Sequence, residues 1–204
     1  MAIPKECKMP DLTYLDSLMS RLIIQALIGD PGISPKAALY RRNFIRLIDK
    51  ALKEYHRSRE AILAQIQETK RPANEMIKNG RQIFIFQFTD HTENCINAIS
   101  RLFKLLDRIK SEREVPALPR KLRKLVETIN KPVDDVRNAI EHIDKKIRND
   151  ETGPGRPIML AINENDDGVV IVNYEIKFEE LAMILGKMHE VAQYILGIKK
   201  MDTE

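Results

Sequence analysis

Apolar residues recur every three or four positions along most of the chain, which predicts a mainly α-helical protein. A first helix is expected after the capping pair Pro10-Asp11, with its stripe beginning at Leu12. Ser34-Pro35 then provides an N-cap and a proline at the first helical position, and the stripe that follows predicts a long helix to about Gln67. A third stripe predicts another long helix over about 81–111, although Ile83 to Phe88 alone resembles a buried strand.

The middle of the chain predicts two shorter helices separated by a proline. A basic helix is expected over about 122–129, and Pro132 is expected to open the next one. The apolar stripe of this second helix comprises Val133, Val136, Ile140, Ile143 and Ile147.

The pattern changes from helical periodicity to alternation near the C-terminus. Alternating apolar residues on both sides of Asn165-Asp166-Asp167-Gly168 predict a β-hairpin over 157–174. Helical periodicity then returns and predicts a final helix over 177–197. We therefore expect a single domain, 1–204, built as an up-and-down helical bundle with an N-terminal helical extension over 1–75 and a C-terminal β-hairpin plus helix.

Composition narrows the class of protein. With 204 residues and 43% hydrophobic residues, the chain is long and apolar enough to form a core. Cys7 and Cys95 are isolated, which argues against a cysteine zinc site and for a reducing compartment. The chain has no secretory signal pattern and no apolar run near the length of a membrane span, so we expect a cytoplasmic protein without a membrane partner.

Charge is unevenly distributed along the chain. The net charge is +4, and residues 101–131 hold ten Lys and Arg against four Asp and Glu. Residues 152–204 hold five against nine. A basic middle segment is typical of a surface that binds nucleic acid, although a solvated helix face has the same composition.

The segment with the most distinctive chemistry is Arg137-Asn138-Ala139-Ile140-Glu141-His142. On a helix that turns about 100° per residue, Asn138 and His142 lie one turn apart and opposite the apolar stripe, with Arg137 on the flank. Imidazole transfers protons near neutral pH, and guanidinium binds phosphate with two parallel hydrogen bonds. These groups suit phosphodiester chemistry. The alternative is a solvated helix face in which Arg137 and Glu141 form an ion pair.

The same residues match R-N-x-x-x-H, a signature of the HEPN superfamily (higher eukaryotes and prokaryotes nucleotide-binding domains). Residues 81–150 resemble the helical core of that family. The resemblance implies a metal-independent RNA endonuclease of toxin or anti-phage defence type, without a cofactor. It also implies a homodimer in which two copies of the motif form one site, and an antitoxin or another protein as a further partner. In that site Arg137, Asn138 and His142 would be catalytic.

Other residues are candidates for weaker roles. Four cations are candidates to bind the RNA backbone, with solvated positions as the alternative: Lys121, Arg123, Lys145 and Arg148. His91 and Glu93 either point at the motif helix or lie on the surface, and Phe84, Phe86, Phe88 and Phe103 are expected in the core rather than as a platform for bases. A second hypothesis for the whole chain is a non-catalytic helical dimer that binds a nucleotide or a protein. No metal-ligand spacing is evident, so we expect no metal site.

Overall fold

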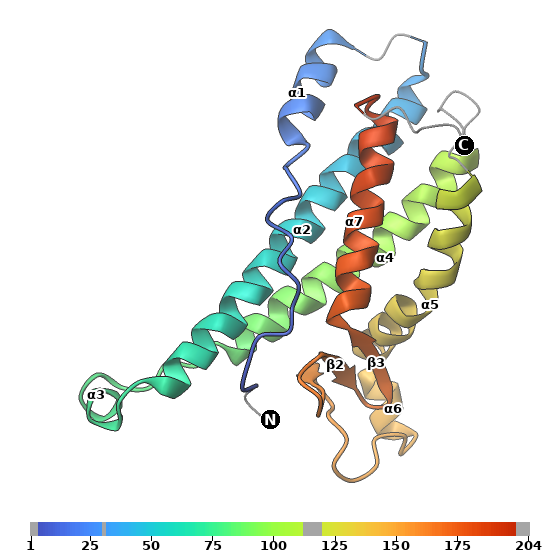
Figure 1. Ribbon diagram of the computed structural model, residues 1–204. Helices are drawn as coiled ribbons and strands as arrows, with labels where there is room; N and C mark the ends of the chain where they lie inside the picture. The colour runs from blue at the N-terminus through green and yellow to red at the C-terminus, as the bar shows by residue number, and fades with distance from the viewer. Residues whose placement is uncertain (1–3, 30–31, 112–119, 199–204) are drawn as a thin grey trace.

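The computed structural model describes residues 4–29, 32–111 and 120–198, and the side chains of 120–129 lie outside the described part. Four long helices form the body: α2 (Pro35–Lys70), α4 (Ile85–Ser111), α5 (Arg120–Glu141) and α7 (Phe178–Ile195). Along the chain they run in alternate directions (Figure 1). This confirms the predicted mainly α-helical bundle. No helix of the described residues is long and apolar enough to cross a membrane.

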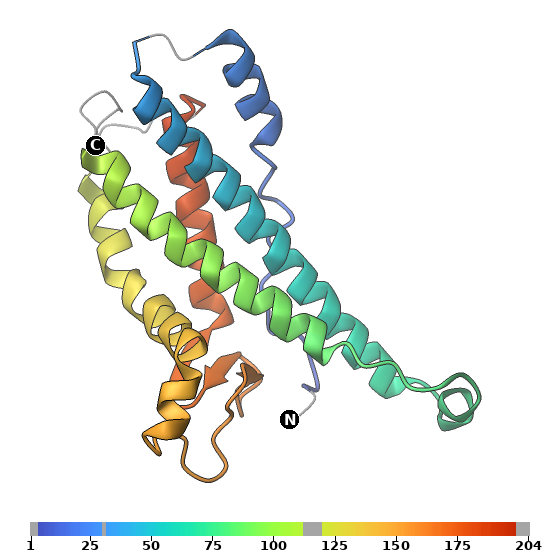
Figure 2. The same ribbon diagram turned by 180° about the vertical axis from the view of Figure 1, so that it is seen from behind.

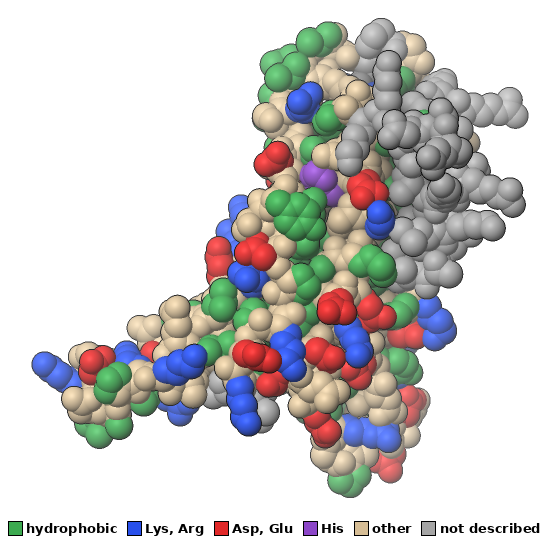
Figure 3. Space-filling view, in the orientation of Figure 1, with side chains coloured by type: hydrophobic (Ala, Val, Ile, Leu, Met, Phe, Trp, Pro, Cys, Tyr) green, Lys and Arg blue, Asp and Glu red, His purple; other side chains and the backbone are tan. Residues whose placement is uncertain are grey.

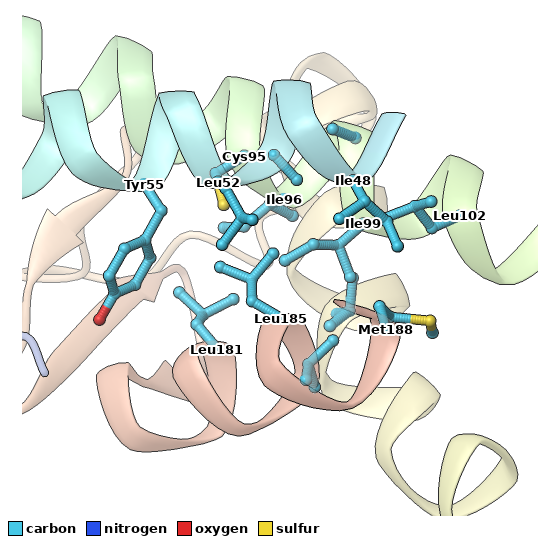
Figure 4. Packing of buried hydrophobic residues seen from close by; sticks show 14 of the residues in the cluster. Ile48, Leu52, Tyr55, Cys95, Ile96, Ile99, Leu102, Leu181, Leu185 and Met188 are labelled. Atoms are coloured by element: carbon cyan, nitrogen blue, oxygen red, sulfur yellow. The ribbon is translucent and has the colours of Figure 1, made fainter. Parts of the chain in front are cut away.

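One continuous apolar core joins the long helices. Ile48 and Leu52 of α2 lie opposite Leu185 of α7, with side chains of α4 between them (Figure 4). Phe88 is fully buried and its ring meets that of Phe178 edge to face, at 6.2 Å between centroids. Phe103 is buried as expected, whereas Phe86 is 53% exposed, so the prediction that it belongs to the core is wrong.

The pair formed by α2 and α4 extends beyond the other helices. Its distal end carries a short helix, α3 (Ala73–Asn79), which the apolar pattern did not predict (Figure 2). The predicted cap of α2 is present, because the Ser34 hydroxyl accepts a hydrogen bond from the Ala37 N–H at 3.3 Å. α4 begins at Ile85 rather than near 81 because the buried Gln65 side chain accepts hydrogen bonds from the N–H groups of Phe84 and Ile85, and so caps the helix from outside.

The predicted N-terminal helix begins later than its apolar pattern indicates. α1 spans Met19–Ile28, and residues 4–18, here called the strap, are not helical. Asp11 accepts a hydrogen bond from the N–H of Thr13 and so forms a turn instead of capping a helix. Leu12 and Leu18 are buried. The expected stripe is therefore a set of contacts made by an extended segment.

Side chains of the bundle bind the backbone carbonyls of the strap. Tyr55 donates to the carbonyl of Pro10 at 2.9 Å, and Arg59 donates to that of Met9 at 3.1 Å. The buried His189 of α7 contacts the carbonyl of Asp16 through Nε2 at 2.8 Å. These contacts hold the strap against the bundle in a non-helical conformation.

Helix α5 runs through Pro132, so the prediction of two helices divided there is wrong. Proline removes one backbone donor and usually breaks a helix. Here Val133 and Val136 are completely buried, and the Ser100 hydroxyl of α4 donates to Asp134 at 3.0 Å. Packing on this side keeps α5 continuous although Pro132 cannot donate a backbone hydrogen bond.

The C-terminal sheet has three antiparallel strands in the order β1 (Ala161–Ile162), β2 (Gly168–Ile171) and β3 (Tyr174–Lys177). The single predicted hairpin over 157–174 is thus two successive hairpins. Val172 has a φ of 56° and lies in the second turn, so the alternation does not continue through it as one strand. Ile158 is 52% exposed and precedes β1. The final helix begins where predicted, because Glu180 caps the Lys177 N–H.

Candidate active site at the junction of α5 and α6

The motif Arg137, Asn138 and His142 lies at the C-terminal end of α5. The buried Val133, Val136 and Ala139 hold this part of the helix against the bundle and the sheet. Because these residues face inward, the side chains of Asn138 and His142 face outward, and both are exposed. The predicted polar face opposite the apolar stripe is present.

The helix predicted to continue to Ile147 is broken at His142. α5 ends at Glu141, His142 has φ −120° and ψ 26°, and α6 covers Ile143–Arg148. The N–H of His142 still donates to the carbonyl of Asn138 at 3.0 Å. Beyond the break the apolar stripe leaves the core, and Ile147 is 51% exposed. His142 therefore lies at a corner of the surface.

The three motif side chains differ in how they are held. Arg137 is half-buried, and its guanidinium donates to the carboxylate of Glu141 and, at 3.5 Å, to the amide oxygen of Asn138. Within the described part of the chain, the imidazole of His142 makes no hydrogen bond. The ion pair of the alternative interpretation is thus present, and the imidazole beside it is open to a ligand.

This geometry limits what the motif can bind. A guanidinium has five N–H donors in a planar fork, and Glu141 accepts from one nitrogen of Arg137, Nη2. A phosphate must compete with Glu141 or use the remaining donors. The pair is surface-exposed on the Glu141 side, where such ion pairs contribute little to stability, so this competition is not prohibitive.

The cations predicted to bind RNA backbone have mixed surroundings. Lys145 is exposed, whereas Arg148 lies 3.5 Å from Asp144 and its neighbour Lys146 lies 3.0 Å from Glu151. The side chains of Lys121 and Arg123 lie outside the described part. Around His142 the described surface therefore carries alternating charges instead of one basic patch.

His91 does not contact the motif. Its Nδ1 lies 2.7 Å from the carboxylate of the buried Glu54 on α2, a partner that helical periodicity could not identify. Glu93 follows on the same helix, and burial together with the charge of Asp90 raises the pKa of its carboxyl. The contact between His91 and Glu54 joins α4 to α2 away from the motif.

A hollow in the described part lies away from the motif. It has a volume of about 740 Å³ and is bounded by the loop before β1 and the outer face of the sheet, including Met159, Val170 and Glu175. No motif residue lines it. The described residues contain no cluster of three or more His, Cys, Asp or Glu side chains arranged to hold a metal ion.

Comparison with known proteins gives no assignment: no family model, no curated protein and no solved structure matches this chain.

Proposed function

We propose that the chain is a metal-independent RNA endonuclease whose active site forms where two copies place their α5–α6 junctions together. The observation that carries this proposal is the exposed, unpartnered imidazole of His142 beside the guanidinium of Arg137. These are the groups that cleavage by the adjacent 2′-hydroxyl requires. The resemblance to HEPN ribonucleases of toxin and defence systems supports the same role.

Each motif residue has a distinct part in the proposed reaction. His142 exchanges a proton with the 2′-hydroxyl or with the leaving oxygen. Arg137 stabilises the charge that develops on the scissile phosphate, and Asn138 orients one of these two groups. Lys145 binds a neighbouring phosphate without contacting the reacting atoms.

The need for a second copy follows from the number of proton-transfer groups. Cleavage needs a base on one side of the phosphorus and an acid on the other, whereas the motif of one chain provides one imidazole. A two-fold axis beside His142 places two imidazoles and two guanidinium groups around one phosphate. The second candidate, a non-catalytic dimer that binds a protein or nucleotide, is favoured by the Arg137–Glu141 ion pair, which occupies the guanidinium in the single chain.

Cleavage of single-stranded RNA by the purified protein is expected to proceed at the same rate with excess chelator, because the proposed proton transfers and charge stabilisation use protein side chains alone. A His142→Ala preparation purified in parallel controls for contaminating nuclease. Activity that is lost in chelator and restored by Mg²⁺ would contradict the metal-independent mechanism.

The protein is expected to be a dimer in solution, measured by light scattering over a wide concentration range. Asn138→Lys should weaken the dimer by about tenfold or more, because it places like charges near each other across the axis. Asn94→Lys, at an exposed position on α4, is the matched control and should have no effect. A protein that is monomeric at every concentration would rule out the composite site.

A further inference from the structure

The distal end of the α2–α4 pair forms an arm that projects from the bundle. This arm tip, residues 70–86, contains the end of α2, helix α3 and the start of α4 (Figure 1). Figure 2 shows from behind that it lies far from α5, α6 and α7. The arm tip is thus separate from the motif and carries no part of the proposed active site.

Large apolar side chains are exposed on the arm tip. Ile77 is 86% exposed, Ile83 is 59% exposed and Phe86 is 53% exposed. Single exposed apolar residues are common, but several within one short projecting segment indicate a contact surface. In Figure 3 hydrophobic side chains lie beside Lys and Arg side chains at this end of the molecule.

Buried polar side chains hold the arm tip in a defined shape. Gln65 accepts hydrogen bonds from Phe84 and Ile85, and the buried carboxylate of Glu68 accepts one from the N–H of Gln82 at 3.0 Å. Glu68 also lies 2.9 Å from Arg71, whose guanidinium donates to the carbonyl of Gly80. The exposed apolar residues therefore sit on a pre-organised segment, which lowers the entropic cost of binding through it.

The charge beside these apolar residues is positive. Lys70, Lys78 and Arg81 are exposed, and none of them has an ion-pair partner among the described residues. Glu75 is the only acidic residue between positions 70 and 86. A partner of this surface should consequently combine negative charge with an apolar interior.

We propose that the arm tip binds the surface of a bilayer that contains anionic lipids. Ile77 and Ile83 insert below the headgroups, while Lys78 and Arg81 contact the lipid phosphates. The tip is convex and its most exposed side chain is aliphatic, which suits a soft apolar interior better than base stacking. The sequence itself predicts no membrane partner, because the chain has no apolar run long enough to span a bilayer. Binding to the bilayer surface needs no such run, so this proposal departs from that expectation.

The test is co-sedimentation of the full chain with vesicles of phosphatidylcholine, with and without phosphatidylglycerol. The protein should sediment with the anionic vesicles and be released by salt, because surface charges are screened. Ile77→Asp and Lys78→Glu should each reduce the partition coefficient by about tenfold or more. Ile77→Ser provides a second apolar deletion, and unchanged thermal melts confirm that the variants fold.

Two control variants match the changes at other exposed sites. Met183→Asp alters α7, where the side chain is 42% exposed, and Lys104→Glu alters α4. Both should bind anionic vesicles like the wild type. The proposal is overturned if the wild type does not sediment, if neutral vesicles bind it equally, or if the controls lose as much binding as the arm variants. It is also overturned if the arm variants lose binding to a single-stranded RNA oligonucleotide while vesicles are not bound.

Discussion

His142→Ala is expected to lower the rate of RNA cleavage by roughly 10²–10⁴-fold, because it removes the proposed proton-transfer group. The free energy of unfolding should change by less than about 1 kcal/mol, since the side chain is exposed and makes no hydrogen bond within the described residues. Single-turnover cleavage of a labelled single-stranded RNA measures the first effect, and urea unfolding followed by circular dichroism measures the second.

Arg137→Ala should have a comparable effect on the rate, because it removes the cation that stabilises the phosphate. Arg137→Lys should recover only part of the activity, since an ammonium group cannot form the two parallel hydrogen bonds of a guanidinium. His56→Ala, at a half-buried position on α2, is a matched control and should leave cleavage unchanged. Equal turnover by the wild type, His142→Ala and Arg137→Ala would support the binding-module alternative. Unfolding of the His142→Ala protein would make that histidine structural.

Asn163→Ala is expected to lower the free energy of unfolding by about 1–3 kcal/mol, because it removes the acceptor of the buried N–H of Gly168 and of the part-buried N–H of Asp167. The Asn163 side chain is 7% exposed, donates to Asp167 and Glu175 at 2.6 Å each, and accepts from the N–H groups of Asp167 and Gly168. Its four hydrogen bonds join the two hairpins of the sheet. The turn also requires glycine at position 168, since the Cβ of any other residue there would lie 2.6 Å from the carbonyl oxygen of Ile176.

The control for this substitution is Asn165→Ala, an exposed position in the same turn, which should change stability by less than about 0.5 kcal/mol.

The two variants should also differ in how their stability depends on pH in the acid range. The hydrogen bond from Asn163 is the main cause that lowers the pKa of Asp167 in the folded protein, with Lys177 contributing. Stability from this carboxylate is present above its unfolded pKa and is lost as pH falls through the folded pKa. Asn163→Ala should weaken that acid dependence, and equal unfolding midpoints for the two variants would contradict the assigned role of Asn163.

The sequence predicted the long helices because their apolar stripes are continuous and their caps are local. Ser34-Pro35 and the stripe of α4 needed no knowledge of distant residues. The strap could not be predicted in the same way, because Leu12 and Leu18 have helical spacing but their segment is held by Tyr55, Arg59 and His189. Periodicity indicates which residues are buried, and here a non-helical segment buries Leu12 and Leu18.

For the candidate site, the helical wheel predicted the exposure of Asn138 and His142 and the flanking position of Arg137. It could not predict the break at His142, since Ile143 and Ile147 continue the stripe in sequence. Nor could it predict that His91 would pair with Glu54, which comes from another helix. The cleavage activity and the dimer remain predictions that rest on the motif.

The strap also has a consequence for the order in which the chain folds. It is synthesised well before α7, yet the contact between Asp16 and His189 joins residues 173 positions apart. Contacts of such long range form late, because closing the intervening loop costs entropy that only an assembled bundle offsets. Until α7 leaves the ribosome, the strap lacks its contact with His189, and the nascent chain is exposed to association through apolar residues of an incompletely anchored segment. Docking of α7 is therefore the step that completes the contacts of the strap.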